Sequence, residues 1–210
     1  REDLRRLVVA EPSILCYRTS NLNGKIRFFT NVVGYTLAEC RQILLQEPRL
    51  LRSSAKEGLV PRFRFLLRDV RISLEGLRKI FLQHPKLLLY SLHDNLVPKL
   101  IYFSIMTLDM TPLQVEDLLT RYPQFMDYNL DRIITPLWQY FTTELGFSNA
   151  EFRNILLKFP RLVSHSLVRK IKHLVGYLRY ELNLRADQVK RTLYQAPTIL
   201  GLSQENLEGK

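Results

Sequence analysis

Prolines at a nearly constant interval are the feature that most constrains this sequence. Each proline follows an amphipathic stretch, and the second and third residues after it are mostly apolar. Neighbouring prolines of this kind are 36 to 38 residues apart. They are Pro12, Pro48, Pro85, Pro123, Pro160 and Pro197. A fixed period of this length is typical of helical repeat proteins, in which each unit covers the apolar face of its neighbour. We therefore expect tandem repeats rather than one or two ordinary globular domains.

Each repeat is predicted to begin with an amphipathic helix that ends at the proline. Capping boxes, in which Ser or Thr precedes Glu or Gln by three residues, mark three of the helix starts: Thr36, Thr111 and Ser148. Apolar residues then follow at a spacing of three and four, as in Phe152, Ile155 and Leu156. The proline ends the helix because it lacks an amide donor and disfavours helical backbone in its predecessor. A short 3₁₀ turn is expected after it.

A second helix is predicted about a dozen residues after this corner. Three repeats carry another proline thirteen residues beyond the first: Pro61, Pro98 and Pro136. Lys25 and His173 stand at this place in the first and fifth repeats, and glycine turns at Gly34 and Gly146 suit left-handed helix ends. No period-two alternation indicates a strand. The predicted fold is an all-α solenoid that forms a single domain over residues 1–210, with about five repeats and partial terminal ones.

Basic residues outnumber acidic ones, 31 to 20, and the surplus lies in two blocks. Residues 41–86 contain eleven basic and four acidic side chains, and residues 153–191 contain ten and two. Residues 87–152 are acidic, with three basic and eight acidic side chains. Such a surplus favours a polyanionic partner, whether nucleic acid, an anionic membrane surface or an acidic protein. A basic surface that only maintains solubility is the alternative.

The two basic blocks supply the candidate nucleic-acid-binding residues. The residue after the corner proline is basic in three of six repeats, which would direct these charges the same way in each repeat. The complete set of candidates is Arg49, Arg52, Arg62, Arg64, Arg68, Lys86, Lys99, Arg161, Arg169, Lys170, Lys172 and Arg179. We expect them to contact phosphates and to make binding salt-dependent. The alternative is that several of these long side chains lie over apolar surface.

The acidic middle segment has two interpretations, a solvated face or a docking surface for a basic protein partner. Its members are Glu116, Asp117, Asp127, Asp131, Glu144 and Glu151. The aromatic residues of the second helices are similarly open to two readings, base stacking or packing between repeats, and packing is favoured. They are Phe28, Phe29, Tyr102, Tyr140, Phe141 and Tyr177.

No catalytic, cofactor-binding or metal-binding site is predicted. The histidines have no metal-ligand spacing with one another or with a cysteine: His84, His93, His165 and His173. Neither a phosphate-binding glycine loop nor a Gly-x-Ser-x-Gly elbow occurs. Cys16 and Cys40 do not indicate a disulfide framework, and we expect Cys40 to be buried. No apolar run approaches the ~20 residues of a membrane span, so no membrane partner is expected.

The repeated pattern φ-x-x-φ-φ-x-x-x-P-x-L-L, with a second proline thirteen residues on, resembles the mitochondrial transcription termination factor (mTERF) family over essentially the whole chain. The resemblance implies a half-doughnut-shaped, left-handed solenoid with two α-helices and one 3₁₀ helix per repeat. It also implies a basic groove for nucleic acid and a mitochondrial or plastid location. Lys25, His173 and the acidic middle segment depart from the pattern.

Two functions remain open at this point. The first is a non-catalytic organellar protein that binds duplex DNA or structured RNA, acts as a monomer, and regulates transcription termination or gene expression. The second is a scaffold of an organellar ribosome or rRNA-maturation complex, which the acidic middle segment favours. The mitochondrion is the expected organelle, with the plastid as the alternative. The sequence begins at Arg1 within a predicted helix and so carries no information about a targeting peptide.

Overall fold

The computed structural model describes residues 2–201, and for residues 105, 106 and 165–169 it describes the backbone alone. Every regular element in the described residues is helical, which confirms the all-α prediction. The chain divides into two compact units, Arg1–Leu100 and Ile101–Lys210, and each is described by itself. The single-domain expectation remains a prediction.

The first unit contains the first three repeats. Its elements, with 3₁₀ or π helices labelled η, are α1 (Glu2–Ala10), the 3₁₀ helix η1 (Pro12–Cys16), α2 (Thr19–Arg27), the π helix η2 (Phe28–Val33), α3 (Leu37–Gln46), the 3₁₀ helix η3 (Pro48–Leu51), the π helix η4 (Ala55–Leu59), α4 (Val60–Arg64), the π helix η5 (Phe65–Asp69), α5 (Leu74–Gln83), the 3₁₀ helix η6 (Pro85–Leu89), the π helix η7 (Leu92–Leu96) and α6 (Val97–Ile101), whose last residue lies beyond the unit boundary.

The second unit continues the same alternation. Its elements are the π helix η8 (Tyr102–Met106), α7 (Pro112–Arg121), the 3₁₀ helix η9 (Pro123–Asp127), the π helix η10 (Leu130–Ile134), α8 (Thr135–Gln139), the π helix η11 (Tyr140–Glu144), α9 (Asn149–Lys158), the 3₁₀ helix η12 (Pro160–Val163), α10 (His165–Tyr180), α11 (Ala186–Gln195) and the 3₁₀ helix η13 (Pro197–Gly201).

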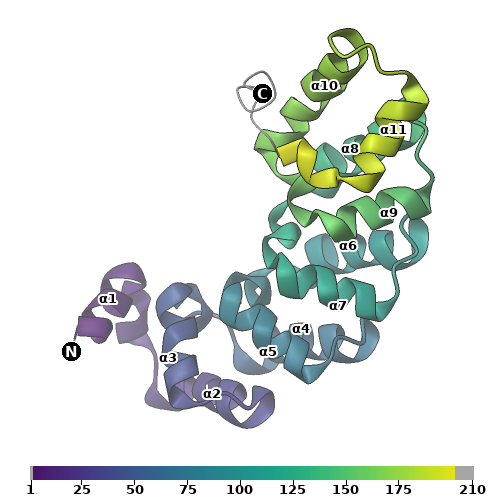
Figure 1. Ribbon diagram of the computed structural model, residues 1–210. Coiled ribbons are helices and arrows are strands. Elements are labelled where there is room, and N and C mark those ends of the chain that lie inside the picture. The colour runs from purple at the N-terminus through teal and green to yellow at the C-terminus, as the bar shows by residue number, and fades with distance from the viewer. Residues whose placement is uncertain (1, 202–210) are drawn as a thin grey trace. The chain divides into compact units, whose positions relative to one another are not determined.

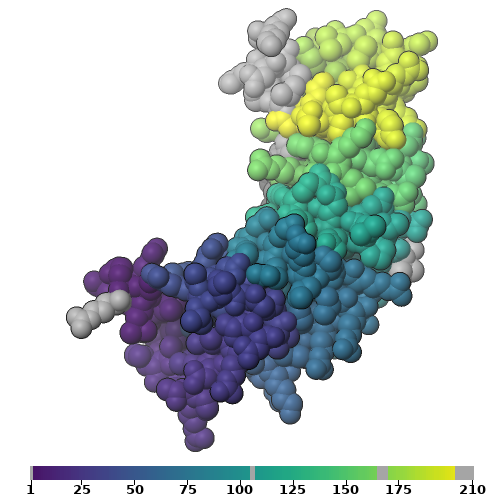
Figure 2. Space-filling view, turned by 60° about the horizontal axis from the view of Figure 1, so that its bottom comes forward, coloured from purple at the N-terminus to yellow at the C-terminus, as the bar shows by residue number. Residues whose placement is uncertain are grey.

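The first helices of successive repeats pack side by side within each unit. Helices α1, α3 and α5 are neighbours in the first unit, and α7, α9 and α11 are neighbours in the second (Figure 1). In the space-filling view, consecutive parts of the sequence occupy consecutive bands of each unit's surface (Figure 2). This arrangement follows from the amphipathic pattern, because the first helices from α3 onward bury apolar residues against the neighbouring repeats, whereas the terminal helix α1 has no buried residue.

The corner proline sets the geometry that the sequence predicted. The residue before it leaves the helical region, with φ and ψ of −136° and 77° at Glu47 and −143° and 68° at His84. A 3₁₀ turn then starts at each of the six prolines. Apolar residues of this turn, such as Leu50 and Leu87, are fully buried in the inner repeats, whereas Leu15 of the terminal repeat is exposed. The predicted 3₁₀ corner is therefore confirmed.

The second helix is more irregular than the amphipathic pattern indicated. In the second, third and fourth repeats it consists of a π segment, a short α-helix and a second π segment. Proline cannot donate a helical hydrogen bond, and these three repeats carry the second proline. The fifth repeat has His173 instead, and there α10 continues unbroken for 16 residues. In the first repeat, which has Lys25 at this place, the leading π segment is absent but the π helix η2 still follows α2. The second proline therefore coincides with the leading π segment and not with the trailing one.

The second helix ends at a left-handed residue in every repeat whose end is described. The predicted glycine turns are confirmed, with φ of 83° at Gly34 and 69° at Gly146. The same place is held by non-glycine residues in the other repeats, with φ of 64° at Arg71, 46° at Asp109 and 50° at Asn183. Left-handed backbone is costly for residues with a Cβ, so the packing of the repeats stabilises these three turns.

The second-helix aromatics contribute to the core. Phe28 meets Phe63 edge to face at 5.7 Å between ring centroids, and Phe141 lies 5.2 Å from Phe152. These buried rings confirm the packing interpretation for Phe28 and Phe141, whereas Tyr102, Tyr140 and Tyr177 are half-buried. Cys40 is 3% exposed, so the prediction of a buried thiol is also confirmed.

Candidate nucleic-acid interface

Several basic residues of the two blocks hold neighbouring repeats together. In each pair, an acidic residue near the start of the first helix of one repeat meets a basic residue of the first helix of the next repeat. The basic residue lies two positions nearer its own corner proline than the acidic residue does. The pairs are Asp3 with Arg41, Glu39 with Arg78 at 3.5 Å, and Glu151 with Lys190 at 2.9 Å. We call these the inter-repeat ion pairs. Part of the excess of basic side chains therefore stabilises the packing of the repeats and is not free to bind a ligand.

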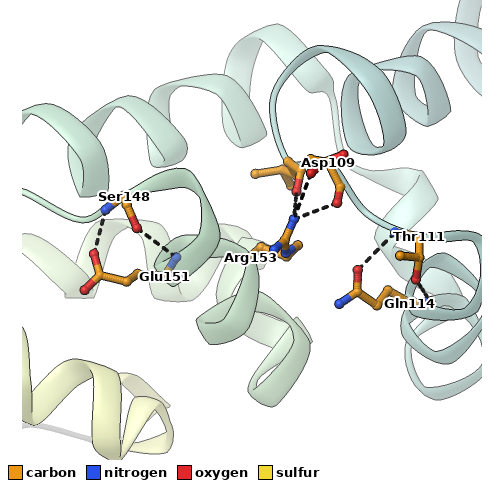
Figure 3. Close-up of polar contacts among 7 residues, drawn as sticks. Asp109, Thr111, Gln114, Ser148, Glu151 and Arg153 are labelled. Atoms are coloured by element: carbon orange, nitrogen blue, oxygen red, sulfur yellow. Dashed lines mark hydrogen bonds and ion pairs between the residues drawn. The ribbon is translucent and has the colours of Figure 1, made fainter.

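The capping boxes take part in this arrangement. Ser148 Oγ accepts a hydrogen bond from the Glu151 amide, while the Glu151 carboxylate accepts one from the Ser148 amide (Figure 3). These hydrogen bonds and Lys190 hold the pKa of Glu151 below its usual value. Arg153, on the same helix, donates to the backbone oxygens of Leu108 at 2.9 Å and Asp109 at 2.6 Å (Figure 3). Arg153 thereby covers one of the strained left-handed turns.

Arg49, the first predicted binding residue, is engaged with a buried carboxylate. Its Nε and Nη2 donate to the two oxygens of Glu47 at 2.7 and 2.8 Å. Glu47 is 8% exposed, and this bidentate pair holds the pKa of its carboxyl below the usual value. Lys86, at the same position of the next repeat, also favours the charged form of Glu47. The charges of Arg49 and Lys86 are thus partly compensated within the protein.

Arg62 has a structural role that the sequence did not indicate. Its Nε donates to the Tyr90 carbonyl at 2.5 Å and its Nη1 to the Gly58 carbonyl at 2.7 Å. Burial lowers the pKa of the guanidinium. Arg62 therefore links the second helix of its own repeat to the corner of the next, and its guanidinium is already occupied by backbone oxygens.

Lys99 is buried rather than presented to a phosphate. It is 4% exposed, its Nζ donates to Asn95 Oδ1 at 3.0 Å, and it lies 5.9 Å from the centre of the Tyr90 ring. Burial, and secondarily the charge of Lys86, lower the pKa of Lys99 to about 8. This placement corrects the expectation that Lys99 is a surface contact for nucleic acid.

Lys25, Arg62 and Lys99 occupy one equivalent place. Each stands three residues before the π segment that starts at an aromatic residue, at Phe28, Phe65 and Tyr102. Burial lowers the pKa of all three side chains. The corresponding residue of the fourth repeat is the apolar Leu137. This equivalence is not apparent when positions are counted from the corner prolines, because the first repeat is one residue shorter than the others. Alignment on the aromatic residues that start the π segments reveals it.

Three predicted arginines of the first unit project into solvent. Arg52 follows the corner η3, and Arg64 and Arg68 lie one turn apart on α4 and η5. Side chains four residues apart in a helix share a face. Among the described residues, no hydrogen bond or ion pair engages these three guanidinium groups. They are available to a polyanion, in contrast to Arg62, whose guanidinium donates to backbone oxygens, and to the buried Lys99.

The second unit presents a comparable group. Arg161, Lys170 and Lys172 are exposed, and Lys172 Nζ lies 5.1 Å from the centre of the Tyr140 ring. Arg179 is half-buried, and its Nε has no hydrogen-bond partner within the described part of the chain. The Arg169 side chain lies outside the described residues. The structure therefore leaves three exposed candidate cations in each unit that make no hydrogen bond or ion pair among the described residues.

Part of the acidic middle segment is already engaged. Asp117 pairs with Arg121 one turn later on α7, and Glu151 belongs to an inter-repeat ion pair. Asp131 and Glu144 are exposed, and so is Asp127, which also interacts within the protein. A basic protein partner for these three carboxylates remains a prediction.

Other kinds of site find no support in the described residues. Among the side chains that the structure describes, His, Cys, Asp and Glu form no group of three that could hold a metal ion. None of the helices described is both long and apolar enough to cross a membrane.

Comparison with known proteins agrees with the repeat pattern. The mTERF family model matches residues 1–140 and 139–210, which together span the whole chain. A search of curated proteins finds no match. Proteins of the matched family are helical repeat proteins of organelles, and the family suggests a nucleic-acid-binding regulator of organellar gene expression. The chain belongs to the mTERF family.

Proposed function

We propose that this protein binds the phosphate backbone of duplex DNA or structured RNA and regulates transcription termination or gene expression in the mitochondrion. The observation that carries the proposal is the separation of the basic residues into two classes. One class is engaged in contacts that hold the repeats together. The other, exposed class has no hydrogen bonds or ion pairs among the described residues in the first unit: Arg52, Arg64 and Arg68.

The proposed action is occupation of a nucleic-acid site without catalysis. Each phosphate that a cation neutralises releases counterions, so the observed binding constant falls with salt, by about 0.9 in log–log slope per phosphate on duplex DNA. The six exposed candidates, three in each unit, correspond to a slope of about −5 if all are used. Such contacts give affinity and position, whereas base contacts would be needed for sequence specificity.

The test is a binding titration of the purified chain with duplex DNA, single-stranded RNA and folded rRNA fragments over a series of salt concentrations. The proposal predicts a steep negative slope for at least one of the double-helical or folded ligands. Weak binding of all ligands, with little salt dependence, would refute it. The ligand with the highest affinity at matched salt identifies the nucleic-acid class.

A scaffold role in an organellar ribosome or rRNA-maturation complex is the second candidate. The exposed carboxylates Asp127, Asp131 and Glu144 favour it, because they could dock a basic protein. This role predicts a complex that survives nuclease treatment when the protein is purified from its own organelle. Dissociation by nuclease would instead favour direct nucleic-acid binding. Fractionation of the same cells distinguishes the mitochondrion from the plastid, and sedimentation tests the expected monomer.

A further inference from the structure

One corner of the first unit lacks the aromatic side chain that the other two corners of this unit carry, and an open pocket lies beside it. The fifth residue after the corner proline is aromatic in four repeats: Tyr17, Tyr90, Tyr128 and His165. The tyrosine hydroxyls meet polar groups of their own corners, Tyr17 with Ser13 at 3.0 Å and Tyr128 with Tyr122 at 2.9 Å. In the second repeat this residue is Ser53. The tyrosine side chain that occupies three of the other corners is therefore missing at this one.

The space beside Ser53 is a shallow pocket of about 330 Å³ that is largely open to solvent. Its lining residues are Arg49, Arg52, Ser53 and Leu89. They come from the corners η3 and η6, which pack against each other within the first unit. The volume is at the lower end of the range for small-ligand sites. It can hold a phosphate together with the sugar attached to it.

The polar groups at this pocket are donors. Arg52 is exposed and has no hydrogen-bond or ion-pair partner among the described residues. Arg49 uses Nε and Nη2 on Glu47, which leaves its Nη1 to donate elsewhere. Ser53 adds a hydroxyl with no hydrogen bond in the described part of the chain. No carboxylate lines the pocket, since Glu47 lies outside the lining and is held by Arg49.

We propose that the Ser53 pocket binds one phosphate group of the nucleic acid, with Arg52 and Arg49 Nη1 as its charged donors. Guanidinium groups suit this ligand because they donate paired N–H bonds to phosphate oxygens. The inference rests on the proposed function and deepens it, by assigning one phosphate to an open pocket between two corners. An experiment can refute this phosphate site while leaving the proposed nucleic-acid binding intact.

The experiment fills the pocket without changing the charge. Ser53→Tyr introduces the residue that three other corners already carry, and Ser53→Ala is the control that leaves the pocket open. Arg52→Gln removes the main charged donor, and Arg5→Gln is the matched control at an exposed arginine of α1. Circular dichroism and urea unfolding establish that each variant folds. Binding of the preferred nucleic acid is then measured against salt.

The proposal predicts that Ser53→Tyr and Arg52→Gln each reduce the steepness of the log–log slope by about 0.9 on duplex DNA, or about 0.7 on a single strand. Ser53→Ala and Arg5→Gln should keep the wild-type slope. A wild-type slope in folded Ser53→Tyr would overturn the proposal, even if nucleic-acid binding itself is confirmed. If Ser53→Tyr does not fold, the comparison of Arg52→Gln with Arg5→Gln decides in the same way.

Inorganic phosphate distinguishes a free ligand from a nucleic-acid backbone. If the wild type binds no nucleic acid, the proposed function fails, and phosphate is titrated into protein with labelled arginine side chains. A shift of the Arg52 Nε–H resonance in the wild type, absent in Ser53→Tyr, would support a phosphate site with another source. The absence of any shift would overturn the pocket proposal as well.

Discussion

Replacement of the buried Lys99 by methionine should stabilise the protein at neutral pH. The pKa of Lys99 is lowered from 10.5 to about 8, mainly by burial. At about 1.4 kcal/mol per pKa unit, the charged form costs about 3 kcal/mol relative to the unfolded chain. Loss of the hydrogen bond to Asn95 offsets about 1 kcal/mol of the gain. Methionine has a similar length and no charge, so we expect a net stabilisation of about 2 kcal/mol at pH 7.

The pH dependence gives this prediction a second readout. Between pH 8 and 10.5 the unfolded state retains a proton that native Lys99 has released, so the stability of the wild type rises with pH. From pH 7 to pH 9 the rise due to Lys99 is about 1.3 kcal/mol. Lys99→Met lacks this contribution. Its advantage over the wild type should therefore shrink by the same amount.

The assay is urea unfolding of both proteins at pH 7, 8 and 9, followed by far-ultraviolet circular dichroism. The difference between the two proteins cancels the pH dependence of groups that they share, including Lys25 and the buried tyrosines. A variant that is less stable than the wild type at pH 7 would refute the reasoning. So would a difference in unfolding free energy that does not change with pH.

Two further substitutions test the stabilising contacts. Arg62→Met should lower the free energy of unfolding by about 2 kcal/mol, opposite in sign to Lys99→Met, because it leaves the Tyr90 and Gly58 carbonyls without their donor. Stability equal to or above that of the wild type in urea unfolding would contradict this role. Arg71→Gly should raise stability by about 0.5–1 kcal/mol, because glycine accepts the left-handed backbone at φ 64° without a Cβ clash. A loss of stability would show that the Arg71 side chain contributes more than its backbone strain costs.

The corners and first helices could be predicted from sequence because their signals are local. A proline dictates its own backbone and that of its predecessor, and a capping box lies within four residues. The left-handed turns at Arg71, Asp109 and Asn183 were missed, since no glycine marks them; Asp and Asn tolerate this backbone, whereas Arg does so at a cost. The π segments were missed because the spacing of apolar residues carries no signal for a change in the backbone hydrogen-bond pattern.

The candidate interface was only partly predictable, because the partners that remove a cation from the surface lie in another repeat. Arg62 donates to a carbonyl 28 residues away. Glu39 and Arg78 pair across 39 residues. A run of basic residues cannot show which of its members are engaged in this way. Lys99 is likewise buried by the packing of the folded repeats, and the residues adjacent to it in the sequence do not indicate this burial.

The most direct test of the account compares exposed arginines with those in inter-repeat ion pairs within the first unit. One double variant carries Arg64→Gln and Arg68→Gln, and the other carries Arg41→Gln and Arg78→Gln. Both lose two positive charges, so a general effect of net charge is matched. Each is assayed for nucleic-acid binding over a salt series and for urea unfolding.

The account predicts that the first variant loses about 2 from the steepness of the log–log salt slope on duplex DNA and keeps its stability. The second should keep the slope and lose about 1 kcal/mol of unfolding free energy, through the ion pairs and the contact of Arg78 with the Tyr35 ring. Equal slopes in the two variants, or the larger loss of slope in the Arg41 and Arg78 variant, would contradict the assignment of the exposed arginines to nucleic-acid binding.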